Sequence, residues 1–326
     1  MIPKLDSSNK YIYMSLQFVD ANDGVSISED LGIEPMGSKK KFWLILQDSE
    51  EQQPWLFKYA RENTGEHWAE KIASELASRI HIPAARTELA EIGGKAGILV
   101  ESFIPCEWDA RLKNSVRLGE LIHGNEVLAG CLDNYDKHKQ WGHKEHSWQN
   151  IHLCLQRSLN NIDQAMEQFA GFLILDALIG NTDRHHENWG LISIFSSSNQ
   201  MDSSDKISMA PSYDHASSLG RELTDQKRNF YLNSSRMEDY VRKAHGAIFH
   251  ISQGKYGDNP LKLVQDLSKL HPIWFRPWME QLHDVTEHDI EEILMKLPGE
   301  VISKTSIEFC RKFLIYTMNC LKDIPL

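Results

Sequence analysis

The chain has 326 residues, of which 41% are hydrophobic and 25% are charged, proportions typical of a soluble globular protein rather than a disordered one. Its net charge of −11 argues against an extensive basic surface, so we expect no direct binding to nucleic acid. The five cysteines are widely spaced and form no Cys-x-x-Cys pair, which disfavours both a disulfide framework and a structural zinc site.

The first third of the chain is expected to be rich in strands. Aromatic side chains alternate along residues 54–59, and this period of two predicts a strand that points Lys58 to the face opposite the aromatic residues. Residues 67–79 change to helical spacing, with Trp68, Ile72 and Leu76 recurring every fourth residue. Further strands are expected over residues 11–19, 42–46 and 96–100.

The remainder is expected to be mainly helical. The longest apolar run, residues 169–180, is too short to span a bilayer, and residues 1–20 lack the apolar core of a secretory signal, so we expect no membrane span. A hairpin with strands over residues 190–195 and 207–210 is predicted beyond that run. The clearest helices are predicted over residues 164–180, 261–270, 288–297 and 306–321. These patterns predict an α+β fold with a strand-rich lobe over residues 1–105 and a helical lobe over residues 106–326.

One short segment carries most of the chemical information. Asp183 and Asn188 stand five residues apart directly after an apolar helix, and a second acid, Asp214, follows. This is the spacing between the catalytic Asp and the metal-binding Asn in protein kinases. Asp183 could therefore act as the base that accepts a hydroxyl proton, while Asn188 and Asp214 offer oxygen ligands for magnesium. The alternative is a polar loop in which these residues only cap turns.

Basic residues in the first lobe could hold the phosphates of ATP. Lys58 lies on an otherwise apolar strand, where a buried ammonium group would need a phosphate and a carboxylate, and Glu70 on the following helix could supply that carboxylate. Gly37 lets backbone amides approach a phosphate, and Lys41 at the end of the same segment adds positive charge. Ser38 between them is a candidate site of autophosphorylation. The alternative for Lys58 is a solvent-facing lysine on an edge strand. The alternative for residues 37–41 is a solvated basic run.

Histidines near the loop are expected to be structural. We place His185 among the candidate cofactor-binding residues, and we expect its ring to bond the loop backbone rather than act as a base. His138, His143 and His146 lie near Trp141, but their spacing matches no standard metal pattern, so a surface loop is the preferred interpretation.

The run from Gly180 to Gly190, together with the segment from Ala210 to Asp214, resembles the HipA-type serine/threonine kinases of bacteria. The resemblance implies a two-lobed protein-kinase-like fold and ATP- and Mg-dependent transfer to Ser or Thr of a protein, with autophosphorylation. It implies Lys58 on the α- and β-phosphates, Asp183 as base, Asn188 and Asp214 on magnesium, Lys41 in the phosphate loop, and adenine held by the backbone from Glu101 to Phe103.

The layout is closer to the compact HipA-like kinases, including secreted effector kinases. The expected partners are therefore a protein substrate and either an antitoxin or a host target. The expected location is the bacterial cytoplasm or, for an effector, a host cell.

Four other functions are compatible with the same residues. Phosphoinositide kinases and small-molecule kinases also carry an Asp-Arg-His-x-x-Asn loop, although no basic amphipathic helix for membrane docking is apparent here. A pseudokinase scaffold would retain the fold alone. A nucleotide transferase would use ATP but transfer the nucleotide, which carries the α-phosphate, rather than the γ-phosphate.

Overall fold

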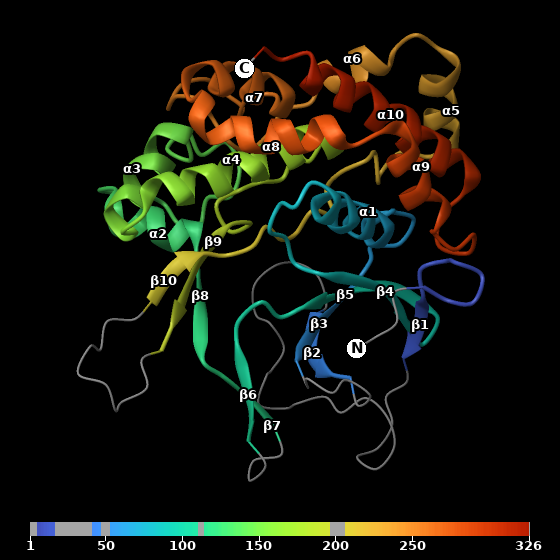
Figure 1. Cartoon of the computed structure of the whole chain (residues 1–326), viewed down its shortest axis with the longest axis horizontal. Helices are drawn as coiled ribbons and strands as arrows, with labels where there is room; N and C mark the ends of the chain where they lie inside the picture. Colours follow the sequence, from blue (N-terminus) through green and yellow to red (C-terminus); the bar gives the residue numbers. More distant parts are fainter. Residues whose placement is uncertain (1–4, 17–40, 47–52, 110–113, 196–205, 326) are drawn as a thin grey trace.

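The computed structural model describes residues 5–16, 41–46, 53–109, 114–195 and 206–325 (Figure 1). Its N-terminal part is built around a β-sheet and its C-terminal part is helical, which confirms the predicted α+β, two-part fold. Gly37 and Ser38 lie outside the described residues.

The N-terminal part contains a five-stranded sheet in the order β1–β4–β5–β3–β2. The pairs are antiparallel except β1 with β4, which is parallel. The strands predicted over residues 42–46 and 96–100 correspond to β2 and β5, whereas β4 was not predicted. The bounds are β1 (Tyr13–Leu16), β2 (Lys41–Ile45), β3 (Pro54–Tyr59), β4 (Thr87–Ile92) and β5 (Lys95–Glu101).

Strand β3 has the alternation predicted from its sequence. Trp55 and Phe57 pack into a small cluster on one face of the sheet, whereas Leu56 belongs to the large core on the other face. Lys58 shares the face of Leu56, and Lys41 stands directly opposite it in the β2–β3 pairing. The two lysines therefore project from the same face of neighbouring strands.

Helix α1 (Glu66–Arg79) lies between the sheet and the helical part (Figure 1). It contacts β4 and β5 on one side and α4 and α9 on the other. The predicted apolar stripe of Trp68, Ile72 and Leu76 is buried, so the helical spacing predicted for this segment is confirmed.

Three short strands and a hairpin join the two parts. Strand β8 pairs with β9, which pairs with β10, and the β9–β10 hairpin is the one predicted from the sequence. Strands β6, β7 and β8 were not predicted. The bounds are β6 (Cys106–Asp109), β7 (Asn114–Arg117), β8 (Gly119–His123), β9 (Gly190–Ile194) and β10 (Lys206–Met209).

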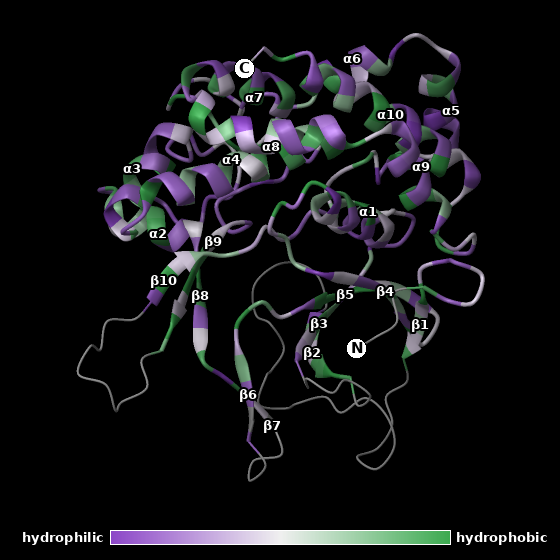
Figure 2. Ribbon diagram, in the orientation of Figure 1, coloured by the Kyte–Doolittle hydropathy of each residue, from purple (hydrophilic) through white to green (hydrophobic). Residues whose placement is uncertain are grey.

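Helix α4 (Ile162–Ile179) is the centre of the helical part. It packs against α3, α7, α8 and α10 and is buried along most of its length, as expected of its apolar run. Helices such as α8 and α10 carry both hydrophobic and hydrophilic residues along their length (Figure 2). Across the described part of the chain, no helix has the length and apolar character needed to cross a membrane.

The remaining helical bounds are α2 (Gly124–Cys131), α3 (Trp148–Ser158), α5 (Asp225–Asn233), α6 (Met237–Arg242), α7 (Pro260–Leu270), α8 (Pro272–Asp284), α9 (Glu287–Met295) and α10 (Lys304–Lys322).

Candidate active site

The loop that carries Asp183 begins where helix α4 ends. Gly180 closes the helix in the left-handed conformation, with φ 65°, and its backbone N–H donates to the carbonyl of Asp176. A Cβ atom at this position would also approach the ring of Phe313 to 2.5 Å. Glycine is therefore required here both by the backbone conformation and by the close packing of α10.

A buried ion pair ties the loop back to α4. The guanidinium of Arg184 donates from Nε and Nη2 to the two carboxylate oxygens of Asp176, at 2.8 and 2.7 Å. Its Nη1 donates to the backbone carbonyl of Asn188 at 2.8 Å. Asn181 also donates to Asp176, at 2.8 Å, and accepts from the Asp183 backbone N–H at 3.0 Å. The loop is thus held from its start to Asn188 by two buried charges that sequence reasoning did not single out.

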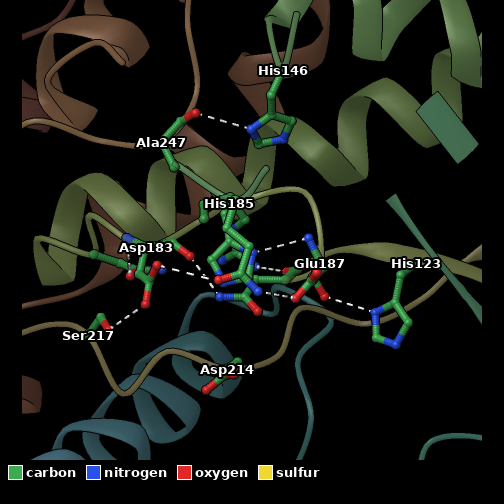
Figure 3. Close-up of polar contacts among 12 residues, drawn as sticks. His123, His146, Asp183, His185, Glu187, Asp214, Ser217 and Ala247 are labelled. Carbon is green, nitrogen blue, oxygen red and sulfur yellow. Dashed lines mark hydrogen bonds and ion pairs between the residues drawn. The ribbon is translucent and has the colours of Figure 1, made fainter. Parts of the chain in front are cut away.

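The Asp183 carboxylate faces a second segment of the chain (Figure 3). Its Oδ2 accepts a hydrogen bond of 2.9 Å from Ser217 Oγ. Its Oδ1 is buried and has no hydrogen-bond partner among the described residues, with His185 Nε2 lying 3.8 Å away. Burial raises the pKa of Asp183 above its ordinary value, and the charge of Asp214 adds to this, although His185 and Ser217 act in the opposite direction.

Asn188 and Asp214 are oriented by the backbone around them. Asn188 Nδ2 donates to the Asp183 carbonyl at 2.7 Å, which leaves the Oδ1 end of the amide to accept or to bind a cation. Asp214 adopts φ 60°, a left-handed conformation that Asp tolerates better than most residues. The segment before it is anchored to the N-terminal part, because Ser212 exchanges backbone hydrogen bonds with Pro83 and Ala85 at 2.8 Å.

Lys58 forms an ion pair with Asp214, at 3.4 Å between Nζ and Oδ1. The expected partner, Glu70, is only 1% exposed and instead accepts a hydrogen bond of 2.9 Å from the backbone N–H of His215. Burial alone would raise the pKa of Glu70, but a hydrogen bond from His215 and the charge of Lys58 outweigh it and lower the pKa. Glu70 therefore acts on Lys58 through its charge and through the neighbouring residue, rather than by the direct pair expected from the sequence.

These side chains line one pocket of about 610 Å³ between the sheet and the helical part. Almost all the described candidates from the sequence lie in its wall: Lys41, Lys58, Glu101, Phe103, Asp183, His185, Asn188 and Asp214. The exception is Glu70, which is buried and is not among the residues described as lining the pocket. The volume of the pocket is within the range of small-molecule sites.

Several lining residues were missed by sequence reasoning. The ring of Tyr213 stacks on Phe103 at 5.6 Å, and its hydroxyl donates to the carbonyl of Glu187 at 2.9 Å. Arg117 lies over the ring of Trp43 at 4.4 Å. The sequence shows only the aromatic or basic character of these positions, and the contacts that place them in the pocket join distant segments.

The structure agrees with the expectation for His185 but not with that for His143 and His146. His185 Nδ1 accepts a hydrogen bond of 3.2 Å from the Glu187 backbone N–H, which confirms that it bonds the loop backbone. The expected surface loop is wrong for His143 and His146, because both side chains are buried. Trp189 Nε1 donates to His146 Nε2 at 3.1 Å, so His146 Nδ1 carries the proton and donates to the Ala247 carbonyl at 3.1 Å.

Burial lowers the pKa of His146 to about 3, which keeps this ring neutral. Within the described ranges, no three His, Cys, Asp or Glu side chains are grouped so that they could hold a metal ion.

Comparison with solved structures supports the fold. The chain superimposes on a Helicobacter pylori proinflammatory kinase, CtkA, with a TM-score of 0.68 and 15% identity over 95% of this chain and 98% of that chain. It also matches a chain from the Shewanella oneidensis MR-1 complex of HipA, HipB and operator DNA, with a TM-score of 0.56 and 12% identity over 94% of this chain and 69% of that one. No curated protein matches the chain.

The sequence family is identified independently of these folds. The model described as the HipA-like C-terminal domain matches residues 33–251, a segment that contains the whole pocket wall described above. Since this match spans more than half of the chain, the protein belongs to the HipA-like family of kinases.

Proposed function

We propose that this protein is an ATP- and magnesium-dependent kinase that transfers the γ-phosphate to a serine or threonine of a protein, and that it also phosphorylates itself. Membership of the HipA-like kinase family implies phosphotransfer chemistry. The observation that carries the proposal is a buried Asp183 oxygen to which none of the described residues donates a hydrogen bond, in a pocket that Lys58, Asn188 and Asp214 also line.

The donor set fits a magnesium ion. Asn188 offers a neutral amide oxygen and Asp214 a carboxylate, the oxygen ligands that magnesium prefers alongside phosphate oxygens and water. The negative charge of Asp214 also raises the cost of ionising Asp183, so a cation near the two carboxylates would be favoured. When bound, magnesium would neutralise phosphate charge during transfer. We assign Asn188 and Asp214 as its ligands.

The basic side chains fit the phosphates of ATP. Lys41 and Lys58 stand opposite each other on β2 and β3 and both line the pocket, so they bring two positive charges to the place proposed for the phosphates. Lys58 would act on the α- and β-phosphates, with Asp214 keeping Lys58 in position. The backbone from Glu101 to Phe103, at the end of β5, is the proposed site for adenine.

The proposed reaction needs one proton acceptor. The hydroxyl oxygen of the acceptor residue forms a bond to the γ-phosphorus, and the bond from that phosphorus to the β–γ bridging oxygen breaks, which releases ADP. The hydroxyl proton passes to the carboxylate of Asp183. Ser217 holds this carboxylate through a hydrogen bond, and Ser217 and His185 both favour its ionised form against the larger opposing effect of burial.

The test uses purified protein with magnesium and γ-labelled ATP, beside Asp183→Ala and the exposed control Asp133→Ala, followed by mass spectrometry. Because a positioned base contributes about 10²- to 10⁴-fold to rate, Asp183→Ala should lose at least 100-fold of the transfer whereas Asp133→Ala should keep it. Label from α-labelled ATP would indicate a nucleotide transferase instead. Label found only in lipid or small molecules would reject the protein acceptor.

A further inference from the structure

We infer that a second pocket beside Asp183 receives the protein acceptor and selects a serine or threonine that has a bulky apolar residue close to it in sequence. This inference rests on the proposed kinase function, because the pocket is linked to the reaction through Asp183. It adds the chemical class of the acceptor segment to that function.

The second pocket has a volume of about 530 Å³ and meets the first at four residues: Trp141, Asp183, Ser217 and Arg221. The described lining of the second pocket includes neither Lys58 nor Asp214, the groups proposed to act on phosphate and magnesium. Asp183 therefore stands where two separate concavities join. An acceptor hydroxyl in the second pocket and a phosphate in the first would meet at the same carboxylate.

Aromatic side chains form one wall of the second pocket. Tyr231 packs against Tyr240 with ring centroids 4.9 Å apart, and Tyr240 packs against Phe313 at 6.0 Å. Apolar residues from other elements continue this wall, among them Leu223 and Leu261. A wall of this composition favours apolar over charged side chains, because burying an unpaired charge against it would be costly.

The charges in the second pocket do not favour an acidic or a basic substrate. Arg221 is already engaged by two carboxylates, Glu66 and Glu222, the latter at 3.0 Å. Lys243 adds one positive charge at an exposed position, and the carboxylate of Asp183 at the shared edge offsets it with one negative charge. Selection by charge is therefore weak, and the aromatic wall is the dominant feature.

The dimensions fit an extended peptide rather than a single side chain. Consecutive residues of an extended chain advance by about 3.3–3.6 Å, so a side chain within three positions of the acceptor can reach well beyond Asp183. Trp141 is 56% exposed and lines both pockets, which places an apolar ring at the point where such a peptide would enter. The occupant we infer is thus an extended segment of the substrate protein.

The experiment uses a positional-scanning library of serine-centred peptides, each with one fixed residue within three positions of the serine. Wild-type protein should phosphorylate peptides with Leu, Met or Phe at the preferred position about tenfold faster in kcat/KM than the same peptide with Ala, a typical effect of one apolar pocket contact. Leu261→Asp should reduce this ratio to about one, since it places a charge in the apolar wall.

The matched control is Leu270→Asp, the same change at the other end of α7. Leu270 is 60% exposed and lies outside the described lining of both pockets, so this variant should keep the tenfold preference. Leu261 is the second residue of α7, where an acidic side chain is compatible with the helix dipole, so the substitution should leave the fold intact. Ala244→Trp, which fills the pocket from a different segment, should also remove the preference.

Two failures can be distinguished. If transfer to peptides or to the protein itself depends on Asp183 but shows no apolar preference, or if the preference survives in Leu261→Asp and Ala244→Trp, the acceptor pocket is wrong and the kinase function stands. If no serine or threonine is phosphorylated in an Asp183-dependent manner, the kinase function itself fails, and the acceptor pocket fails with it.

Discussion

Asp183 has to be ionised to accept a proton, yet its surroundings oppose ionisation. Burial is the largest influence and raises its pKa, and the negative charge of Asp214 acts in the same direction. The hydrogen bond from Ser217 and the charge of His185 lower it in part. The balance favours a base whose proton affinity is higher than that of an ordinary Asp, which suits a group that must take up a proton in the transition state.

We expect kcat/KM for phosphotransfer to fall at acidic pH as Asp183 is protonated, at a pH above the ordinary range for Asp. Ser217→Ala removes a hydrogen bond that favours the ionised carboxylate, so the pKa of Asp183 should rise and the acidic limb should move to higher pH. The measurement is the pH profile of kcat/KM for both proteins. Ser158→Ala, whose hydroxyl bonds the Cys154 carbonyl, is the control and should leave the profile unchanged. A limb that moves to lower pH in Ser217→Ala would contradict this account.

The candidate site was predictable from the sequence where its residues lie close together in the chain. Asp183 and Asn188 are five residues apart, and Asn188 indeed bonds the Asp183 carbonyl. Ser217 and the Lys58–Asp214 pair could not be found in the same way, because these contacts join segments brought together only by folding. His146 was misjudged since its polar neighbours indicate a surface, whereas Trp189 and Ala247 satisfy both ring nitrogens and permit burial.

At the level of elements, helix α4 holds the loop that follows it through Asp176 and Arg184. Both side chains are almost fully buried, and both carboxylate oxygens of Asp176 accept from the guanidinium. Breaking such a pair by removing one partner leaves an uncompensated charge in the interior. The buried Asp176–Arg184 ion pair therefore stabilises both the fold and the position of Asp183.

Asp176→Ala should lower the free energy of unfolding by about 3–5 kcal/mol, because Arg184 would remain buried without its carboxylate. Urea denaturation followed by circular dichroism measures this change. The control is Asp266→Ala, which breaks the exposed pair with Lys262 on α7 and should cost about 0.5 kcal/mol or less. An equal loss in the free energy of unfolding for the two variants would show that the buried Asp176–Arg184 ion pair contributes little to stability.

Long elements with one clear period were the easiest to predict. Helices α1, α4, α7, α9 and α10 and strands β2, β3 and β5 agree with expectations from apolar spacing. Strands β6, β7 and β8 have only four or five residues each, with polar or charged residues among them, so no apolar run marks them as one marks the equally short β2. Strand order and register were beyond reach, because the pairing of β3 between β2 and β5 depends on contacts across the sheet rather than along the chain.

At the scale of the whole molecule, the pocket is built from both parts of the fold. Lys41 and Lys58 come from the sheet, whereas Asp183, Asn188 and Asp214 follow helix α4 in the chain. The Lys58–Asp214 ion pair joins the two sets. The boundary between lobes near residues 105 and 106 remains a prediction, and a ligand that contacts both sides should stabilise them as one unit.

A non-hydrolysable ATP analogue should therefore raise the melting temperature, and magnesium should add to the shift. At a ligand concentration 100 times Kd, the gain is about 2.7 kcal/mol. Asp214→Asn should lose most of the increment from magnesium, because an amide is a weaker ligand for this ion than a carboxylate. Asn also tolerates φ 60°, so the backbone at this position should be retained. Differential scanning calorimetry with and without magnesium measures both shifts, and Asp133→Asn should behave as wild type. An undiminished magnesium increment in Asp214→Asn would exclude Asp214 as the metal ligand.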